Sequence, residues 1–168
     1  MSPILKGVII TLAIIVFAVI TAIVGIEKSR SFGWVQYLLI IAGIIWACIG
    51  YSKEKDGNVT FGNVFAHGFK VTAVVTCIFI LYMVLALKVI FPDIKEQSIA
   101  IMRTEMAKQP KQPEQNTEQL EKIISGVSEN FVLITATGTM IVFLIVGAVA
   151  SLAGAVVAKK NPDTNPIG

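Results

Sequence analysis

The feature that most constrains this chain is a set of four long apolar runs that hold almost no charge. The last of them, Asn130–Ala158, contains no ionisable side chain at all. A helix of about 20 residues crosses the ~30 Å hydrocarbon core of a bilayer. A backbone in lipid must also satisfy its own hydrogen bonds, which favours helices. The runs therefore predict transmembrane helices at about residues 7–26, 32–51, 64–91 and 130–158.

The composition also favours a membrane protein. Apolar residues make up 55% of the 168 residues and charged residues only 15%, whereas soluble domains have about 45–50% and ~25%. The net charge of +3 is too small and too dispersed to indicate a nucleic-acid partner. Lys6 and the apolar run after it look like a signal peptide. However, the run exceeds the usual h-region of about 7–15 residues, which favours a retained helix.

The one long polar segment, residues 92–129, separates the third predicted span from the fourth. Both of its halves carry apolar residues at helical spacing, and Pro110–Pro113 interrupts them. Asn116 or Thr117 is a candidate cap for the second half. The expected fold is an all-α integral membrane protein, with one domain over residues 1–168. An extramembrane helical hairpin is expected between the third and fourth transmembrane helices.

The basic residues predict an orientation in the membrane. The side of both termini carries Lys6, Lys53, Lys55, Lys70, Lys159 and Lys160. The opposite side has Lys28 and Arg30 in a short turn, and a long segment whose basic residues are interspersed with acidic ones. The positive-inside rule therefore places the termini in the cytoplasm and segment 92–129 outside, which is the periplasm in a bacterium.

The stretch from Asp56 to Lys70 marks the start of the third predicted span. Asp56-Gly57 predicts a turn, and Thr60 is a candidate N-cap for the helix that follows. Phe61, Phe65 and Phe69 share one helical face, which we interpret as an interfacial anchor. His67, the only histidine, is expected to be exposed to lipid headgroups. Metal binding or pH sensing is the less favoured interpretation of His67.

The pattern Gly57-x-x-Thr60-Phe61-Gly62-x-x-Phe65-x-x-Gly68-Phe69 follows two predicted spans and precedes a third that ends near Pro92. This arrangement resembles the small bacterial membrane proteins of domain-of-unknown-function family 4199, and the likeness extends over nearly the whole chain. The resemblance implies a location in the bacterial inner membrane. The family has no established activity, so the resemblance implies no catalytic residue, cofactor or metal site.

Small residues at helical spacing indicate close helix packing. They are Ala18, Ala22 and Gly25 in the first span, Gly43 and Ala47 in the second, and Gly138, Gly147, Ala150, Ser151, Gly154 and Ala155 in the fourth. The fourth span is therefore expected to be the central packing helix. Cys48 and Cys77 lie within predicted spans and are expected to be small core residues, without a disulfide or a metal.

The residues that usually carry chemistry are scarce. The sequence has no paired carboxylates, histidine cluster, Cys-x-x-Cys or phosphate-binding glycine loop. The predicted spans also hold no ionisable group away from their ends, where membrane enzymes and coupled transporters usually place one. We therefore expect a non-enzymatic structural or accessory subunit, without a cofactor, that packs against a membrane partner through its small-residue faces.

Two other functions stay open at this point. A small transporter or channel could act as a homo-oligomer, with threonines around a pore. The candidate threonines are Thr72, Thr76, Thr135, Thr137 and Thr139. Threonines in membrane helices more often bond their own backbone or a neighbouring helix, which favours packing for those of the fourth span. A membrane enzyme with His67 at an interfacial site is the third hypothesis.

Overall fold

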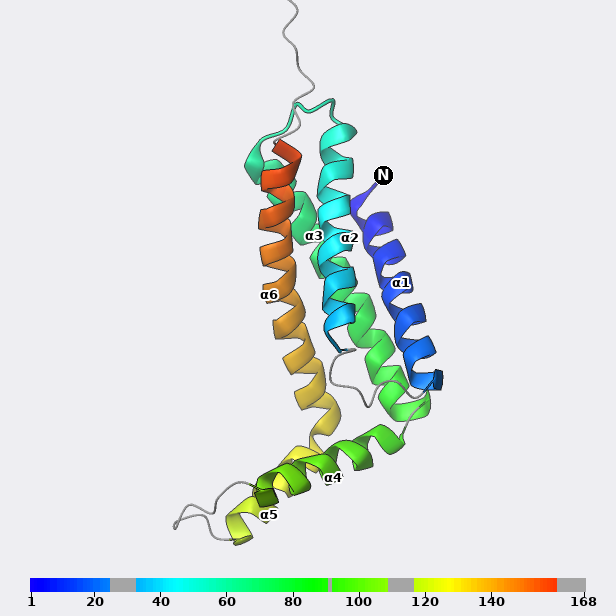
Figure 1. Ribbon diagram of the computed structural model, residues 1–168, viewed down its shortest axis with the longest axis vertical. Coiled ribbons are helices and arrows are strands. Elements are labelled where there is room, and N and C mark those ends of the chain that lie inside the picture. The colour runs from blue at the N-terminus through cyan, green and yellow to red at the C-terminus, as the bar shows by residue number, and fades with distance from the viewer. Residues whose placement is uncertain (25–32, 91, 109–116, 160–168) are drawn as a thin grey trace, which may run out of the picture. The chain divides into compact units, whose positions relative to one another are not determined.

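The computed structural model describes residues 1–24, 33–90, 92–108 and 117–159 of the chain (Figure 1). Throughout these ranges the regular structure is helical, and four helices are long and apolar enough to cross a membrane. Those four stretches are Pro3–Thr21, Trp34–Lys53, Phe61–Ile90 and Phe131–Ala158. The predicted all-α class with four membrane-spanning helices is therefore confirmed.

The helices have the following bounds. They are α1 (Pro3–Val24), α2 (Gly33–Lys53), α3 (Phe61–Leu85), the π-helical turn η2 (Ala86–Ile90), α4 (Asp93–Lys108), α5 (Thr117–Glu129) and α6 (Phe131–Lys159). Three predicted features lie outside the described residues: the turn at 27–31, the break at 110–113 and the tail at 161–168.

Helix α1 begins earlier than the predicted first span. Pro3 occupies its first position, where a missing amide proton does no harm. The hydroxyl oxygen of Ser2 accepts a hydrogen bond from the amide of Leu5 at 3.2 Å, as an N-cap does. Lys6 therefore lies within the helix, where the sequence had placed it before the first span.

The turn between α2 and α3 follows from its own residues. The amide of Gly57 donates to the carbonyl of Ser52 at 3.0 Å, and that of Asp56 to Lys53 at 3.1 Å. This bonding pattern defines a Schellman ending, and it requires the left-handed φ of 51° at Asp56. The hydroxyl oxygen of Thr60 then accepts from the amide of Asn63 at 3.2 Å. The predicted turn and N-cap are both confirmed.

The chain divides by its internal contacts into two units. Unit 1 comprises Met1–Phe79 and Met140–Gly168, and unit 2 comprises Ile80–Thr139. In unit 1, α1 and α2 lie side by side, and the buried apolar side chains include Ile14, Ile44 and Val75.

In unit 2, α4 and α5 contact each other, with Ile124 buried. The two predicted helices of segment 92–129 are thus present. The single domain and the extramembrane position of this segment stay predictions.

Small residues allow the helices of unit 1 to approach closely. A side chain added at Gly154 of α6 would come within 2.8 Å of the Cβ atom of Cys48 in α2. One added at Gly68 of α3 would come within 2.6 Å of the Cys48 sulfur. At Gly147 of α6, an added Cβ atom would collide with Thr72 of α3. The small-residue face of the fourth span therefore packs inside unit 1.

The other predicted small-residue positions have different outcomes. Gly138 of α6 has no atom within 4 Å of an added Cβ, apart from its own helix backbone and chain neighbours. It therefore takes no part in the packing face. Of the stripe predicted in the first span, only Ala18, which is half-buried, has a described side chain. In α2, by contrast, Ala47 is fully buried and Gly43 lies against Ile10 of α1.

Candidate functional site

The most unusual group in unit 1 is the charged side chain of Lys6, which is only 1% exposed. Its ammonium lies 3.0 Å from a carboxylate oxygen of Glu54, just beyond the end of α2. It also donates a hydrogen bond to the carbonyl of Ala47 at 3.4 Å. Burying an unpaired charge costs several kcal/mol, on the order of the whole stability of a small domain. These two partners therefore make the buried position of Lys6 possible.

Glu54 joins two cationic groups. Its second carboxylate oxygen lies 2.8 Å from the ammonium of Met1, so Glu54 holds both Met1 and Lys6. The hydrogen bonds from Met1 and then from Lys6 lower the pKa of the Glu54 carboxyl from 4.5 to about 2. The carboxylate is partly exposed, which limits what this arrangement contributes to stability.

His67 is buried, at 7% exposure, so the predicted exposure to headgroups is wrong. Its ring stacks on that of Tyr51, with centroids 4.2 Å apart and an angle of 14° between the planes. The reason is helical periodicity: Phe61 and Phe69 are exposed on α3, and His67 falls on the opposite face, toward α2. The Nε2 atom of His67 is buried and has no hydrogen-bond partner among the described residues.

The two cysteines have different environments. Cys48 is fully buried, and its thiol lies 3.8 Å from the carbonyl of Val64, as a weak donor would. Cys77 is exposed on α3, so the prediction of two core cysteines is right for Cys48 and wrong for Cys77. Both are free thiols. A small apolar residue on the outer face of a spanning helix is as well accommodated by lipid as one in the core.

Lys6, Tyr51, Glu54 and His67 form what we call the polar cluster of unit 1. Tyr51, in the last turn of α2, stacks on His67, and Glu54, just beyond that turn, pairs with Lys6. Across the described ranges, no three His, Cys, Asp or Glu side chains gather in a way that could hold a metal ion. Sequence reasoning missed the cluster because it joins three helices. The Ser2-Pro3 helix start was the one local signal that Lys6 lies within a helix.

The buried hydroxyl groups bond carbonyls of their own helix or of another helix. Thr72 donates to the carbonyl of Gly68 at 3.1 Å, and Thr76 donates to that of Thr72 at 2.9 Å. Ser52 reaches across to the carbonyl of Ala158 at 3.3 Å, joining the ends of α2 and α6. In unit 2, Thr139 donates to the sulfur of Met83 at 3.6 Å, which is the predicted bond to a neighbouring helix.

Four apolar helices, packed through small residues and with an ion pair between α1 and the end of α2, define a small helical protein compatible with a multi-pass membrane location. The family model described as "Protein of unknown function (DUF4199)" matches residues 6–160. The chain belongs to this family, as the glycine and aromatic pattern before the third span predicted. No curated protein and no solved structure matches the chain.

Proposed function

We propose that this protein is a non-enzymatic structural or accessory subunit of the bacterial inner membrane that packs against another membrane protein. The observation that carries the proposal is that polar side chains of unit 1 bond to one another or to backbone carbonyls within the unit. Lys6 pairs with Glu54, the thiol of Cys48 lies against the Val64 carbonyl, and Ser52 bonds Ala158. Groups engaged in this way hold helices together, which supports a structural role over a catalytic one.

The proposed orientation has both termini in the cytoplasm and segment 92–129 in the periplasm. Lys53, Lys55 and Lys70 support it, because they are exposed around the turn between the second and third spans. A membrane-impermeant maleimide tests it on intact cells, in a variant with Cys77→Ser. A cysteine introduced at exposed Gln97 should react from outside. One introduced at Lys55 should react only after permeabilisation, and the reverse pattern would contradict the orientation.

The partner surface proposed here lies on α4 and α5. The small-residue face of α6 already packs against α2 and α3, so it is not free for the partner contact expected from the sequence. Ile101 on α4 is 63% exposed and Ile123 on α5 is 52% exposed, although both helices also carry many charged and polar residues. We propose that these two exposed side chains contribute to the surface that contacts the partner.

Photocrosslinking in native membranes tests the accessory role. A photoreactive residue at Ile123 should give one discrete adduct when the protein is expressed at its native level. A photoreactive residue in place of Glu121, which is exposed on the same helix, should give much less of this adduct. Purification in a mild detergent should recover a complex larger than the 18.1 kDa chain. A monomer with no adduct would contradict the proposal.

The pore hypothesis has less support. Thr72 and Thr76 are 1% and 3% exposed within unit 1 of a single chain, so they are poorly placed to line a pore between subunits. Their hydroxyl groups already bond backbone carbonyls. Solute flux through liposomes that hold only this purified protein would favour the transporter or channel over the accessory subunit.

A further inference from the structure

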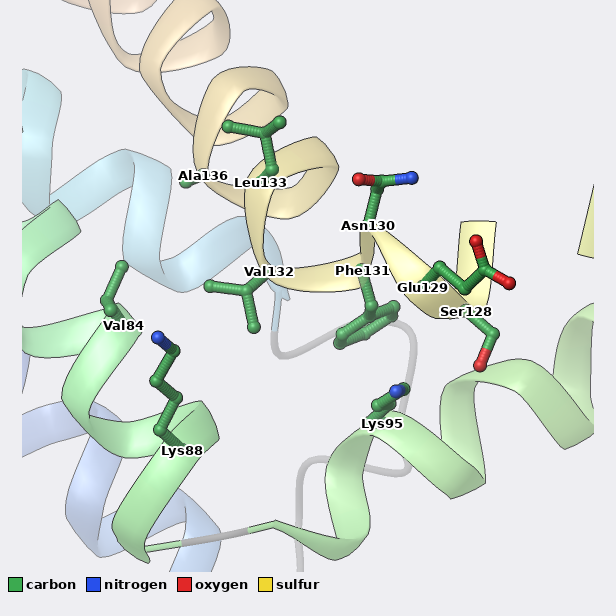
Figure 2. A pocket seen from close by; sticks show the side chains of 10 residues that line it. All are labelled: Val84, Lys88, Lys95, Ser128, Glu129, Asn130, Phe131, Val132, Leu133 and Ala136. Carbon is green, nitrogen blue, oxygen red and sulfur yellow. The ribbon is translucent and has the colours of Figure 1, made fainter. Parts of the chain in front are cut away.

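Unit 2 contains a groove where η2, the start of α4 and the junction of α5 with α6 come together (Figure 2). Its volume is about 410 Å³, within the range of about 300–1,000 Å³ that is usual for ligand sites. The polar part of its wall consists of Lys88, Lys95, Ser128, Glu129 and Asn130. The apolar part consists of Val84, Phe131, Val132, Leu133 and Ala136. The groove thus combines a polar and an apolar wall.

Two lysines give the groove a positive charge. In Figure 2 the Lys88 side chain extends toward Val84 and Val132, and the Lys95 side chain lies beside Phe131. Within the described ranges neither ammonium lies in an ion pair with a carboxylate. The carboxylate of Glu129, which also lines the groove, accepts a hydrogen bond from the hydroxyl of Ser125 at 3.5 Å. The groove therefore offers two ammonium groups to an anion.

The start of α6 adds to this positive potential. The helix begins at Phe131, and the amides of its first turn have no acceptor within their own helix. Phe131, Val132 and Leu133 carry these amides and line the groove. The N-terminus of a helix has a partial charge of about +0.5 and binds anions. Lys88 lies in the π-helical turn η2, a local geometry that is frequent at functional sites.

The position along the spans selects the kind of anion. The third span ends at Ile90 and the fourth begins at Phe131, so both ends reach the same membrane surface. Lys88 and Phe131 therefore lie at the depth of lipid headgroups. Leu133 in the groove wall and Leu85, which follows the lining residue Val84 in the chain, are exposed apolar side chains on the spanning helices, where acyl chains would lie. Lysine ammonium groups bind phosphate as point charges, and the headgroup of an anionic lipid supplies such a phosphate at this depth.

We propose that this groove binds the phosphate headgroup of an anionic phospholipid. Lys88 and Lys95 pair with the phosphate, and the first-turn amides of α6 donate hydrogen bonds to it. Val84, Leu133 and Ala136 contact the start of the acyl chains. The site is independent of the proposed accessory role, because it concerns the lipid around this chain and not a protein partner.

Native mass spectrometry of the full-length protein from nanodiscs tests the site. The nanodiscs contain phosphatidylglycerol and phosphatidylcholine in equal amounts, and the wild type should retain phosphatidylglycerol preferentially. Each lysine near an anionic surface contributes a factor of about five, so Lys88→Gln/Lys95→Gln should reduce this preference roughly 30-fold. Lys88→Arg/Lys95→Arg should keep it. The control variant Lys53→Gln/Lys122→Gln removes the same charge from exposed sites, and it should also keep the preference for phosphatidylglycerol.

Three results of the measurements with the two lipids would overturn the proposal. They are equal retention of the two lipids by the wild type, an undiminished preference in Lys88→Gln/Lys95→Gln, and an equal loss in the control pair. Inorganic phosphate distinguishes the two sources of phosphate. If phosphate alone, added to phosphatidylcholine nanodiscs, is retained through the same two lysines and displaces phosphatidylglycerol, the groove is a soluble-anion site and the lipid assignment is wrong.

Discussion

The ammonium of Lys6 and the carboxylate of Glu54 lie 3.0 Å apart, although Lys6 is buried among the helices and Glu54 is partly exposed. Their positions are therefore not equivalent. If Lys6 is replaced, Glu54 still contacts water and the ammonium of Met1. If Glu54 is replaced, the ammonium of Lys6 is left with only its hydrogen bond to the carbonyl of Ala47. An uncompensated buried charge is the costlier situation.

This asymmetry predicts the order of two substitutions. Glu54→Gln should lower the melting temperature in detergent more than Lys6→Met does, because only the first leaves a buried ammonium without its carboxylate. Thermal unfolding followed by tryptophan fluorescence measures both. Lys55→Gln, at an exposed neighbouring position, serves as the control and should have almost no effect. A larger loss for Lys6→Met than for Glu54→Gln would refute the asymmetry.

The ion pair also predicts a dependence on pH. The pKa of Glu54 falls from 4.5 to about 2 in the folded protein, first through Met1 and then through Lys6. A lowered pKa means that the ionised carboxylate stabilises the fold fully above pH 4.5, and that this contribution is lost as the pH falls toward about 2. The difference in melting temperature between wild type and Glu54→Gln should therefore shrink across this window. If the difference in melting temperature stays constant down to the acidic end of this window, the ionised Glu54 carboxylate does not stabilise the fold.

The packing face of α6 predicts opposite effects for the same substitution at two glycines. Gly147→Ala should destabilise unit 1 by about 1–3 kcal/mol, because the added methyl group collides with Thr72. Gly138→Ala meets nothing within 4 Å in the same helix, and it should stabilise the protein by roughly 0.5–1 kcal/mol through helix propensity. Unfolding in mixed micelles with increasing SDS measures both values. Equal effects of the two substitutions on the free energy of unfolding would show that Gly147 does not lie on a packing face of α6.

The stacked rings predict the effect of two replacements of His67. His67→Phe keeps a ring against Tyr51 and removes the buried Nε2 atom that has no partner among the described residues. The free energy of unfolding should therefore rise or stay unchanged. His67→Ala removes the stack and leaves a cavity, and it should cost about 2–3 kcal/mol. The same SDS titration measures the free energy of unfolding of both variants. A His67→Phe variant as unstable as His67→Ala would mean that the imidazole nitrogens stabilise the fold.

The spans could be predicted because lipid imposes one rule on every residue of a long apolar run. The cap at Thr60 and the turn at Asp56-Gly57 were predictable for a similar reason, since each depends on residues close in the sequence. The polar cluster was not predictable. Helical spacing places His67 opposite Phe61 and Phe69, but its stacking on Tyr51 depends on how α3 is rotated against α2, which helical spacing alone leaves undetermined.

The groove in unit 2 shows the same limit. Lys88 could be recognised as a lysine near the end of a span, and Lys95 as a residue of a polar helix. Their common groove depends on the π-helical turn η2 and on the break between α5 and α6 at Asn130. Neither feature has a clear local signal: α5 runs through Ser125-Gly126, the pair of small residues nearest the break, and ends only at Glu129.

The central claim is that the polar cluster maintains the fold and that the protein acts by binding, without chemistry of its own. Competitive growth tests this claim most directly, with wild type, a deletion strain and a chromosomal His67→Phe variant, in conditions where the deletion slows growth. We predict that the variant grows like the wild type, since it keeps the ring that packs on Tyr51. A variant present at the wild-type level that grows as slowly as the deletion strain would contradict the claim.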